Sequence, residues 1–245
     1  MTLAPPPVTT AQPATQPMIR RGAASFAVWS ARSGTVTAVA AFLSICALEI
    51  YAALTGINLL QATLSQHALR AEGWAFNAAI VLLAAGSAGI HASLAASGIV
   101  RLQSAASLAL GLWCTGLLLV ALFTKHDWSA GPSPSGYAHW MGSVLAFLSL
   151  PAAVLLLARP WRGDPRWRGH AGLTSGLGLL AILCLVPIGT AMAIHLLVGI
   201  PWWEVVHLGL VERLLAFAEV VAVLAVGRWA ISASRAHLPL RHAHA

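Results

Sequence analysis

The sequence predicts an all-α integral membrane protein built as a bundle of six transmembrane helices. Three observations predict it: 58% of the 245 residues are hydrophobic, only 9% are charged, and six apolar runs are each long enough to cross a bilayer. A soluble domain carries about 25% charged residues, so a soluble globular fold is excluded. The length leaves room for six crossings and short loops, and therefore for one membrane domain.

The chain divides into a tail, a membrane domain and a second tail. Residues 1–33 hold five prolines among Thr, Ala and Gln and have no apolar period, which predicts a disordered cytoplasmic tail. Residues 34–232 form the predicted membrane domain, and residues 233–245 form a cytoplasmic C-terminal tail. The predicted helices are 36–57, 74–97, 104–124, 138–158, 173–198 and 208–231.

The first three apolar runs qualify as membrane helices by length and by lack of charge. The run 36–57 follows several arginines, as the core of a signal peptide does, but it is longer than such a core. The runs 74–97 and 104–124 contain no Asp, Glu, Lys or Arg. We therefore expect all three to remain in the protein as helices that cross the membrane.

The last three apolar runs carry the features that distinguish one helix from another. Pro151 in the run 138–158 and Pro187 in the run 173–198 predict kinks that free backbone carbonyls. The run 208–231 contains Glu212, Arg213 and Glu219 at least one helical turn from its ends, and ionisable residues are rare at such depth in a membrane. These three helices are therefore where we expect irregular backbone and polar contacts.

The basic residues predict the orientation of the bundle, because cytoplasmic loops retain Lys and Arg. An even number of crossings places both termini on one side, and eleven of the fourteen basic residues fall on that side. We therefore expect a multi-pass protein of the plasma membrane with both termini in the cytoplasm. Because this topology accounts for the net charge of +7, we expect no nucleic-acid partner. The eleven are Arg20, Arg21, Arg32, Arg101, Arg159, Arg162, Arg166, Arg168, Arg228, Arg235 and Arg241.

Motifs for cofactors and for common catalytic centres are missing from the sequence. It has no phosphate-cradling glycine motif, no HExxH and no GxSxG, so we predict no cofactor and lean against an enzyme. Cys46, Cys114 and Cys184 all fall inside predicted helices and have no metal-ligand spacing. A disulfide framework is therefore not expected.

Four charged side chains fall at least one helical turn inside the predicted helices: Glu49, Glu212, Arg213 and Glu219. Such groups are costly in a bilayer, which makes them functional candidates. Glu212 and Glu219 are seven residues apart and share a helix face, whereas Arg213 is turned about 100° from Glu212. We therefore expect Arg213 to reach Glu49 or Asp127, or to extend to the membrane interface.

Polar side chains near the outer ends of the helices predict a candidate site. One interpretation is an outward-facing polar cavity that binds a lipid headgroup or a small solute. A second is a metal-dependent intramembrane hydrolase, and a third is a structural or partner-binding subunit of undefined oligomeric state. The cavity would use Ser65, Asp127, His139, Glu212, Arg213, Glu49 and His195, and the metal ligands would be His126, Asp127, His139 and His207.

Four segments of the sequence resemble one family of multi-pass bacterial membrane proteins, the domain of unknown function 998. They are the run LLQATLSQHALRAEGWAFNAAIVLLAAG, the segments 123–127 and 136–139, and GLVER at 209–213. The resemblance implies a six-helix fold without an established activity, and the chain departs from it where relatives often carry a proline between the Phe and the Asp. It selects Ser65, Phe123 and Asp127, His139, and Glu212 with Arg213.

Overall fold

The structure, a computed structural model, describes residues 15–127 and 130–236 as helices and connecting loops, with no β-strand in these two ranges. Six of the helices are long and apolar enough to cross a membrane, which confirms the predicted all-α architecture. The six are α1 Thr15–Leu54, α2 Gly73–Ala96, α3 Ala105–Leu122, α4 Pro134–Ala158, α5 Arg168–Val198 and α7 Leu208–Ala236. The short elements are η1 Leu64–Leu69, η2 Arg159–Trp161 and α6 Trp202–Val205.

Helix α1 begins much earlier than the sequence analysis expects. Residues 15–33, expected in a disordered tail, are helical, because Ala27 and Ala31 are buried against the bundle. The hydroxyl of Ser93 on α2 also donates a hydrogen bond to the carbonyl of Ala27 at 2.7 Å. Helix α7 likewise continues to Ala236, past the predicted boundary at residue 232, while the predicted tail segments 1–14 and 237–245 lie outside the described residues.

Small residues bring neighbouring helices into close contact. A side chain at Gly86 of α2 would meet the carbonyl oxygen of Gly34 on α1 at 2.7 Å, and one at Gly34 would meet that of Gly86 at the same distance. Gly116 of α3 and Gly142 of α4 pack in the same manner. Close backbone approach of this kind is a main source of packing between helices in a bilayer. The two pairs α1–α2 and α3–α4 are therefore the tight units of the bundle.

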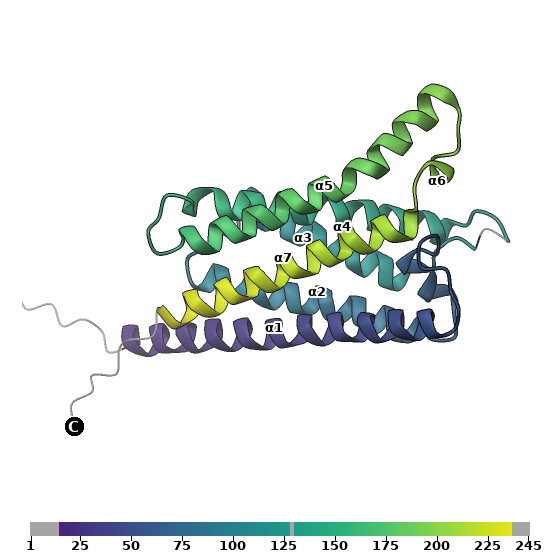
Figure 1. The fold of residues 1–245 in the computed structure, drawn as a ribbon. Helices are drawn as coiled ribbons and strands as arrows, with labels where there is room; N and C mark the ends of the chain where they lie inside the picture. Colours follow the sequence, from purple (N-terminus) through teal and green to yellow (C-terminus); the bar gives the residue numbers. More distant parts are fainter. Residues whose placement is uncertain (1–14, 128–129, 237–245) are drawn as a thin grey trace, which may run out of the picture.

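Helix α5 leaves the bundle in its second half. It contains Pro187, and beyond this residue the helix runs away from α4 and α7 (Figure 1). Leu196 and Leu197 near its end are strongly exposed, and the chain returns to α7 through α6. A proline removes a backbone hydrogen bond and bends a helix, so the predicted kink explains this departure.

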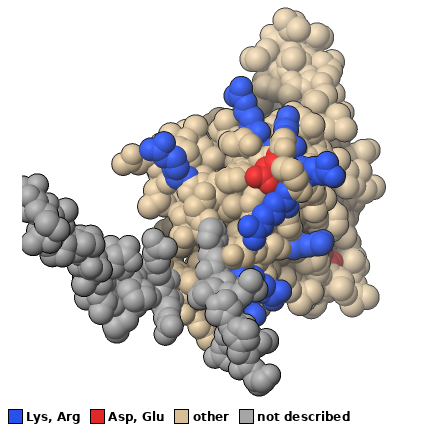
Figure 2. All heavy atoms as spheres, turned by 90° about the vertical axis from the view of Figure 1, so that its left-hand side faces the viewer, with Lys and Arg blue, Asp and Glu red and all other residues tan. Residues whose placement is uncertain are grey.

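The described chain begins and ends at the same end of the bundle (Figure 1). The loops 97–104 and 159–167 lie at this end too, and they carry or border Arg101 and several arginines of the α4–α5 connection. Figure 2 shows that basic side chains gather on this face, with few acidic ones among them. We refer to it as the arginine end, and the end that carries η1 and α6 is the opposite end.

Candidate functional site

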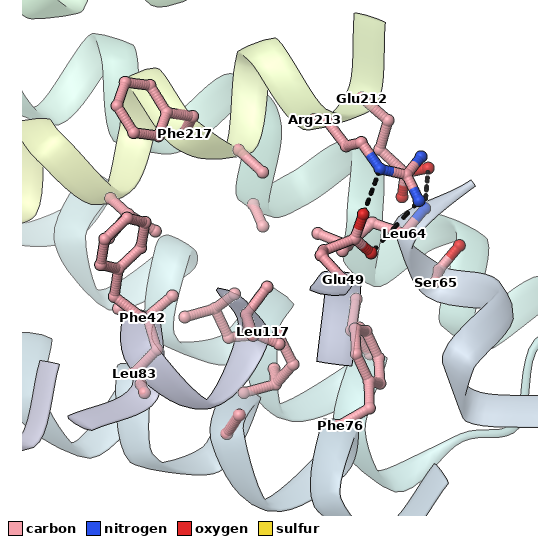
Figure 3. A pocket seen from close by; sticks show the side chains of 18 of the residues that line it. Phe42, Glu49, Leu64, Ser65, Phe76, Leu83, Leu117, Glu212, Arg213 and Phe217 are labelled. Atoms are coloured by element: carbon pink, nitrogen blue, oxygen red, sulfur yellow. Dashed lines mark hydrogen bonds and ion pairs between the residues drawn. The ribbon is translucent and has the colours of Figure 1, made fainter. Parts of the chain in front are cut away.

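An ion pair joins α1 to α7 near the opposite end of the bundle. Arg213 Nε donates to Glu49 Oε2 at 2.5 Å, and Arg213 Nη2 donates to Glu49 Oε1 at 3.2 Å (Figure 3). The two side chains are 18% and 19% exposed, so the pair is mostly shielded from its surroundings. Of the partners that the sequence allows for Arg213, the structure therefore selects Glu49.

The same arginine holds the loop between α1 and η1. Its Nη1 donates to the carbonyl oxygens of Leu59 at 2.9 Å, Ala62 at 2.5 Å and Gly209 at 2.9 Å. Gly209 permits this approach, because a side chain there would collide with the carbonyls of Leu59 and Ala62. Every nitrogen of the guanidinium group thus already has an acceptor within the protein.

A buried histidine extends the ion pair toward η1. His67 Nε2 donates to Glu49 Oε1 at 2.9 Å, and His67 Nδ1 lies 3.5 Å from Glu72 Oε1. His67 is not among the residues predicted for the candidate site. No sequence pattern predicts the 3-10 turn of η1 that buries this side chain. The position of His67 between Glu49 and Glu72 in the sequence is the one feature that could have indicated an ionic contact.

A second polar group surrounds the start of η1. Glu212 Oε2 accepts a hydrogen bond from the backbone N–H of Leu64 at 2.9 Å, so this carboxylate caps the short helix. Lys125 Nζ lies 3.0 Å from Ser65 Oγ and also donates to Thr63 Oγ1. Burial lowers the pKa of the Lys125 amine below its ordinary value, and the nearby Glu212 carboxylate opposes that shift.

These polar groups lie at one end of a cavity of about 560 Å³. Glu49, Ser65, Glu212 and Arg213 line this end, and the remaining walls are almost entirely apolar (Figure 3). Five helices supply the walls, which include Phe42 of α1, Phe76 and Leu83 of α2, Leu117 of α3, Phe147 of α4 and Phe217 of α7. The volume is typical of pockets that bind small molecules, which range from about 300 to 1,000 Å³.

The cavity has its mouth between α1 and α7. Ile50, Leu214 and Phe217 line it, and each has more than half of its surface exposed, so they lie where the wall meets the outside of the bundle. The rings of Phe42 and Phe217 face each other with centroids 6.1 Å apart. Both helices are long and apolar enough to cross a membrane, and in that arrangement this mouth would open sideways toward lipid.

Three residues of the predicted site do not line the cavity. His139 at the start of α4 is buried, and its Nδ1 donates to the carbonyl of Phe123 at 2.9 Å. Asp127 lies on the loop after α3. His195 donates to the carbonyl of Ile200 at 3.0 Å, on the half of α5 that leaves the bundle. The structure thus gathers Glu49, Ser65, Glu212 and Arg213 around one space, and places these three elsewhere.

The predicted metal ligands occupy separate places. His126 Nδ1 accepts a hydrogen bond from the Ser133 backbone N–H at 3.0 Å, and His207 Nδ1 accepts one from the Gln61 amide at 3.1 Å. Within residues 15–127 and 130–236, no three His, Cys, Asp or Glu side chains come together in a way that could hold a metal ion. The described residues therefore provide no preformed metal centre.

Glu219 lies deeper in α7, outside the cavity. Its side chain is 1% exposed, and its two oxygens have no hydrogen-bond partner among the described residues. An unsatisfied polar group of this kind costs about 1 to 3 kcal/mol.

We therefore expect Glu219→Leu to raise the free energy of unfolding by about 1 kcal/mol or more, because it removes that cost at similar volume. Unfolding in mixed micelles titrated with sodium dodecyl sulfate measures the change. Glu204→Leu, at an exposed position of α6, is the control and should change stability little. Lower stability of the Glu219→Leu protein would mean that this carboxyl has a stabilising partner.

Residues 23–229 match a family model described as protein of unknown function (DUF998). No curated protein and no solved structure matches the chain.

Proposed function

The chain belongs to the DUF998 family, as its sequence resemblance predicts, and we propose that this membrane protein binds a lipid-like amphiphile in the cavity described above. The observation that carries the proposal is the division of the cavity into a long apolar part and one polar end. An amphiphile with one apolar tail and a small polar head has the same division. The mouth between α1 and α7 would admit such a molecule directly from the bilayer.

The charges at the polar end favour an uncharged head. Glu49 is neutralised by Arg213, and Glu212 lies near Lys125, so the two acidic and two basic groups balance. The guanidinium of Arg213 is already used by Glu49 and three carbonyls, so it offers little to a phosphate. The hydroxyl of Ser65 and the carboxylate of Glu212 line the cavity at this end, where they can meet a hydroxyl or amide group of the head.

The arginine end supports an orientation for this cavity. Cytoplasmic loops retain basic residues, and basic side chains gather where the described chain begins and ends (Figure 2). We therefore propose that both termini are cytoplasmic in a plasma membrane and that the polar end of the cavity lies in the outer half of the bilayer. The ligand would then come from the outer leaflet.

Filling the cavity tests this function. Cys46 lines the cavity, whereas its neighbour Ala47 is exposed on the other face of α1. We expect Cys46→Phe to weaken the binding of a monoacylglycerol by about tenfold or more, and Ala47→Phe to leave it unchanged. Native mass spectrometry of the protein in lipid nanodiscs that contain 1-monooleoylglycerol measures the bound fraction.

A charged amphiphile with the same tail completes the design. We expect oleoyl lysophosphatidic acid to bind less than 1-monooleoylglycerol, because its phosphate would need a cation that the site already uses. Equal binding of the monoacylglycerol by wild type and Cys46→Phe would overturn the proposed function. Loss of binding in Ala47→Phe as well would show that lipid adheres to the outside of α1 instead of entering the cavity.

A further inference from the structure

Ser65 and Lys125 form a pair that the binding of an amphiphile does not require. The amine nitrogen of Lys125 lies 3.0 Å from the hydroxyl oxygen of Ser65, and Ser65 lines the cavity at its polar end. Ser65 is 9% exposed, so its hydroxyl is shielded from bulk water. The second acceptor of the amine is Thr63 Oγ1, which itself lies 3.3 Å from Ser65 Oγ.

We propose that Ser65 is a nucleophile activated by Lys125, and that the cavity holds the acyl ester on which it acts. The inference rests on the proposed function, because the apolar walls would place the ester group of the bound amphiphile at the polar end. A serine within hydrogen-bond reach of a lysine amine is one of the known arrangements for acyl transfer. It needs neither a metal ion nor a cofactor.

The reaction balances with the two side chains and one water. Lys125 Nζ, in its neutral form, takes the proton of the Ser65 hydroxyl as Oγ bonds to the carbonyl carbon of the ester. The carbon–oxygen bond to the alcohol then breaks, and Lys125 returns the proton to the departing alcohol. Water attacks the acyl group on Ser65, Lys125 takes its proton, and the carboxylic acid leaves as that proton returns to Ser65 Oγ.

The surroundings of Lys125 favour its role as a base. A lysine acts as a base only when it is neutral, and burial lowers the pKa of this amine. Two titratable groups from neighbouring elements act on it: Glu212 of α7 favours the charged amine, and His139 of α4 opposes it when that imidazole is protonated. The rate should therefore rise with pH and level off below the ordinary pKa of lysine.

The test is covalent labelling of the protein in nanodiscs with a long-chain alkyl fluorophosphonate. Attack by Ser65 would form an oxygen–phosphorus bond and release fluoride, and peptide mass spectrometry identifies the labelled residue. We expect labelling at Ser65, loss of it in Ser65→Ala, and a decrease of about 100-fold or more in Lys125→Arg. The arginine keeps the positive charge and the donors but cannot serve as a base.

A second serine supplies the matched control. Ser143 of α4 also lines the cavity, where its hydroxyl donates to the carbonyl of His139 at 3.0 Å, and no lysine contact is recorded for it among the described residues. We therefore expect peptide mass spectrometry to find no label on Ser143 in the same wild-type sample. Labelling of Ser65 in wild type with loss in Lys125→Arg supports the proposal.

Equal labelling in wild type and Lys125→Arg, or no labelling of Ser65 although 1-monooleoylglycerol binds, would overturn it. Native mass spectrometry on the same samples separates this result from failure of the proposed function. Absence of bound monoacylglycerol in the wild-type protein would count against the binding cavity itself, and with it against the ester that the inference requires.

Discussion

Arg213→Ala is expected to lower the free energy of unfolding by about 3 to 5 kcal/mol, because it leaves a buried charge without its partner. The change leaves Glu49 without its cation and removes the guanidinium donor from the carbonyl oxygens of Leu59 and Ala62. It therefore frees the loop between α1 and η1 as well as the contact between α1 and α7. Unfolding titrated with sodium dodecyl sulfate in mixed micelles measures the loss.

Arg228→Ala is the control for this experiment, because Arg228 lies on the same helix and is exposed near the arginine end. A double-mutant cycle with Glu49→Gln then isolates the ion pair. We expect Glu49→Gln to cost less in the Arg213→Ala background than in wild type, since its partner is already absent. Equal losses for Arg213→Ala and Arg228→Ala would contradict the role given to the pair.

Gly86→Ala is expected to lower the free energy of unfolding by about 1 to 3 kcal/mol, although alanine normally favours a helix over glycine. The new methyl group would lie 2.7 Å from the carbonyl oxygen of Gly34 and 2.9 Å from the backbone nitrogen of Ala38. Both are backbone atoms of α1, so the helices must move apart to make room. The same titration, together with protease resistance of the folded protein, measures the effect.

Gly111 on α3 is the matched control, because a side chain there would meet nothing within 4 Å. Gly111→Ala should be neutral or slightly stabilising, since it adds helix propensity without a collision. A destabilised Gly111→Ala protein with an unaffected Gly86→Ala protein would show that close approach of α1 and α2 does not limit stability.

The sequence predicts the six membrane helices well, because each of them is a long apolar run and hydropathy reports such runs directly. It fails at the start of α1, where Ala27 and Ala31 are buried by the neighbouring helix. Prolines and polar residues there indicate disorder, and only contact with α2 provides the surface that stabilises a helix. Local composition cannot contain that information.

The candidate site is predicted in part for the same reason. Depth along a helix placed Glu49, Glu212 and Arg213 near one level, and the structure brings them together around the cavity. Depth also suggested His195, but the bend at Pro187 carries the end of α5 away from the bundle. Lateral position depends on helix tilt and packing, which hydropathy does not report.

The sideways mouth between α1 and α7 determines which ligand concentration controls occupancy of the cavity. A ligand that enters from the bilayer reaches the cavity at a frequency set by its mole fraction among the lipids, and only indirectly by its molarity in water. Affinity is therefore a ratio of ligand to lipid. Added detergent takes up part of the ligand and lowers its mole fraction in the apolar phase. Occupancy of the cavity should therefore fall as detergent is added at constant total ligand.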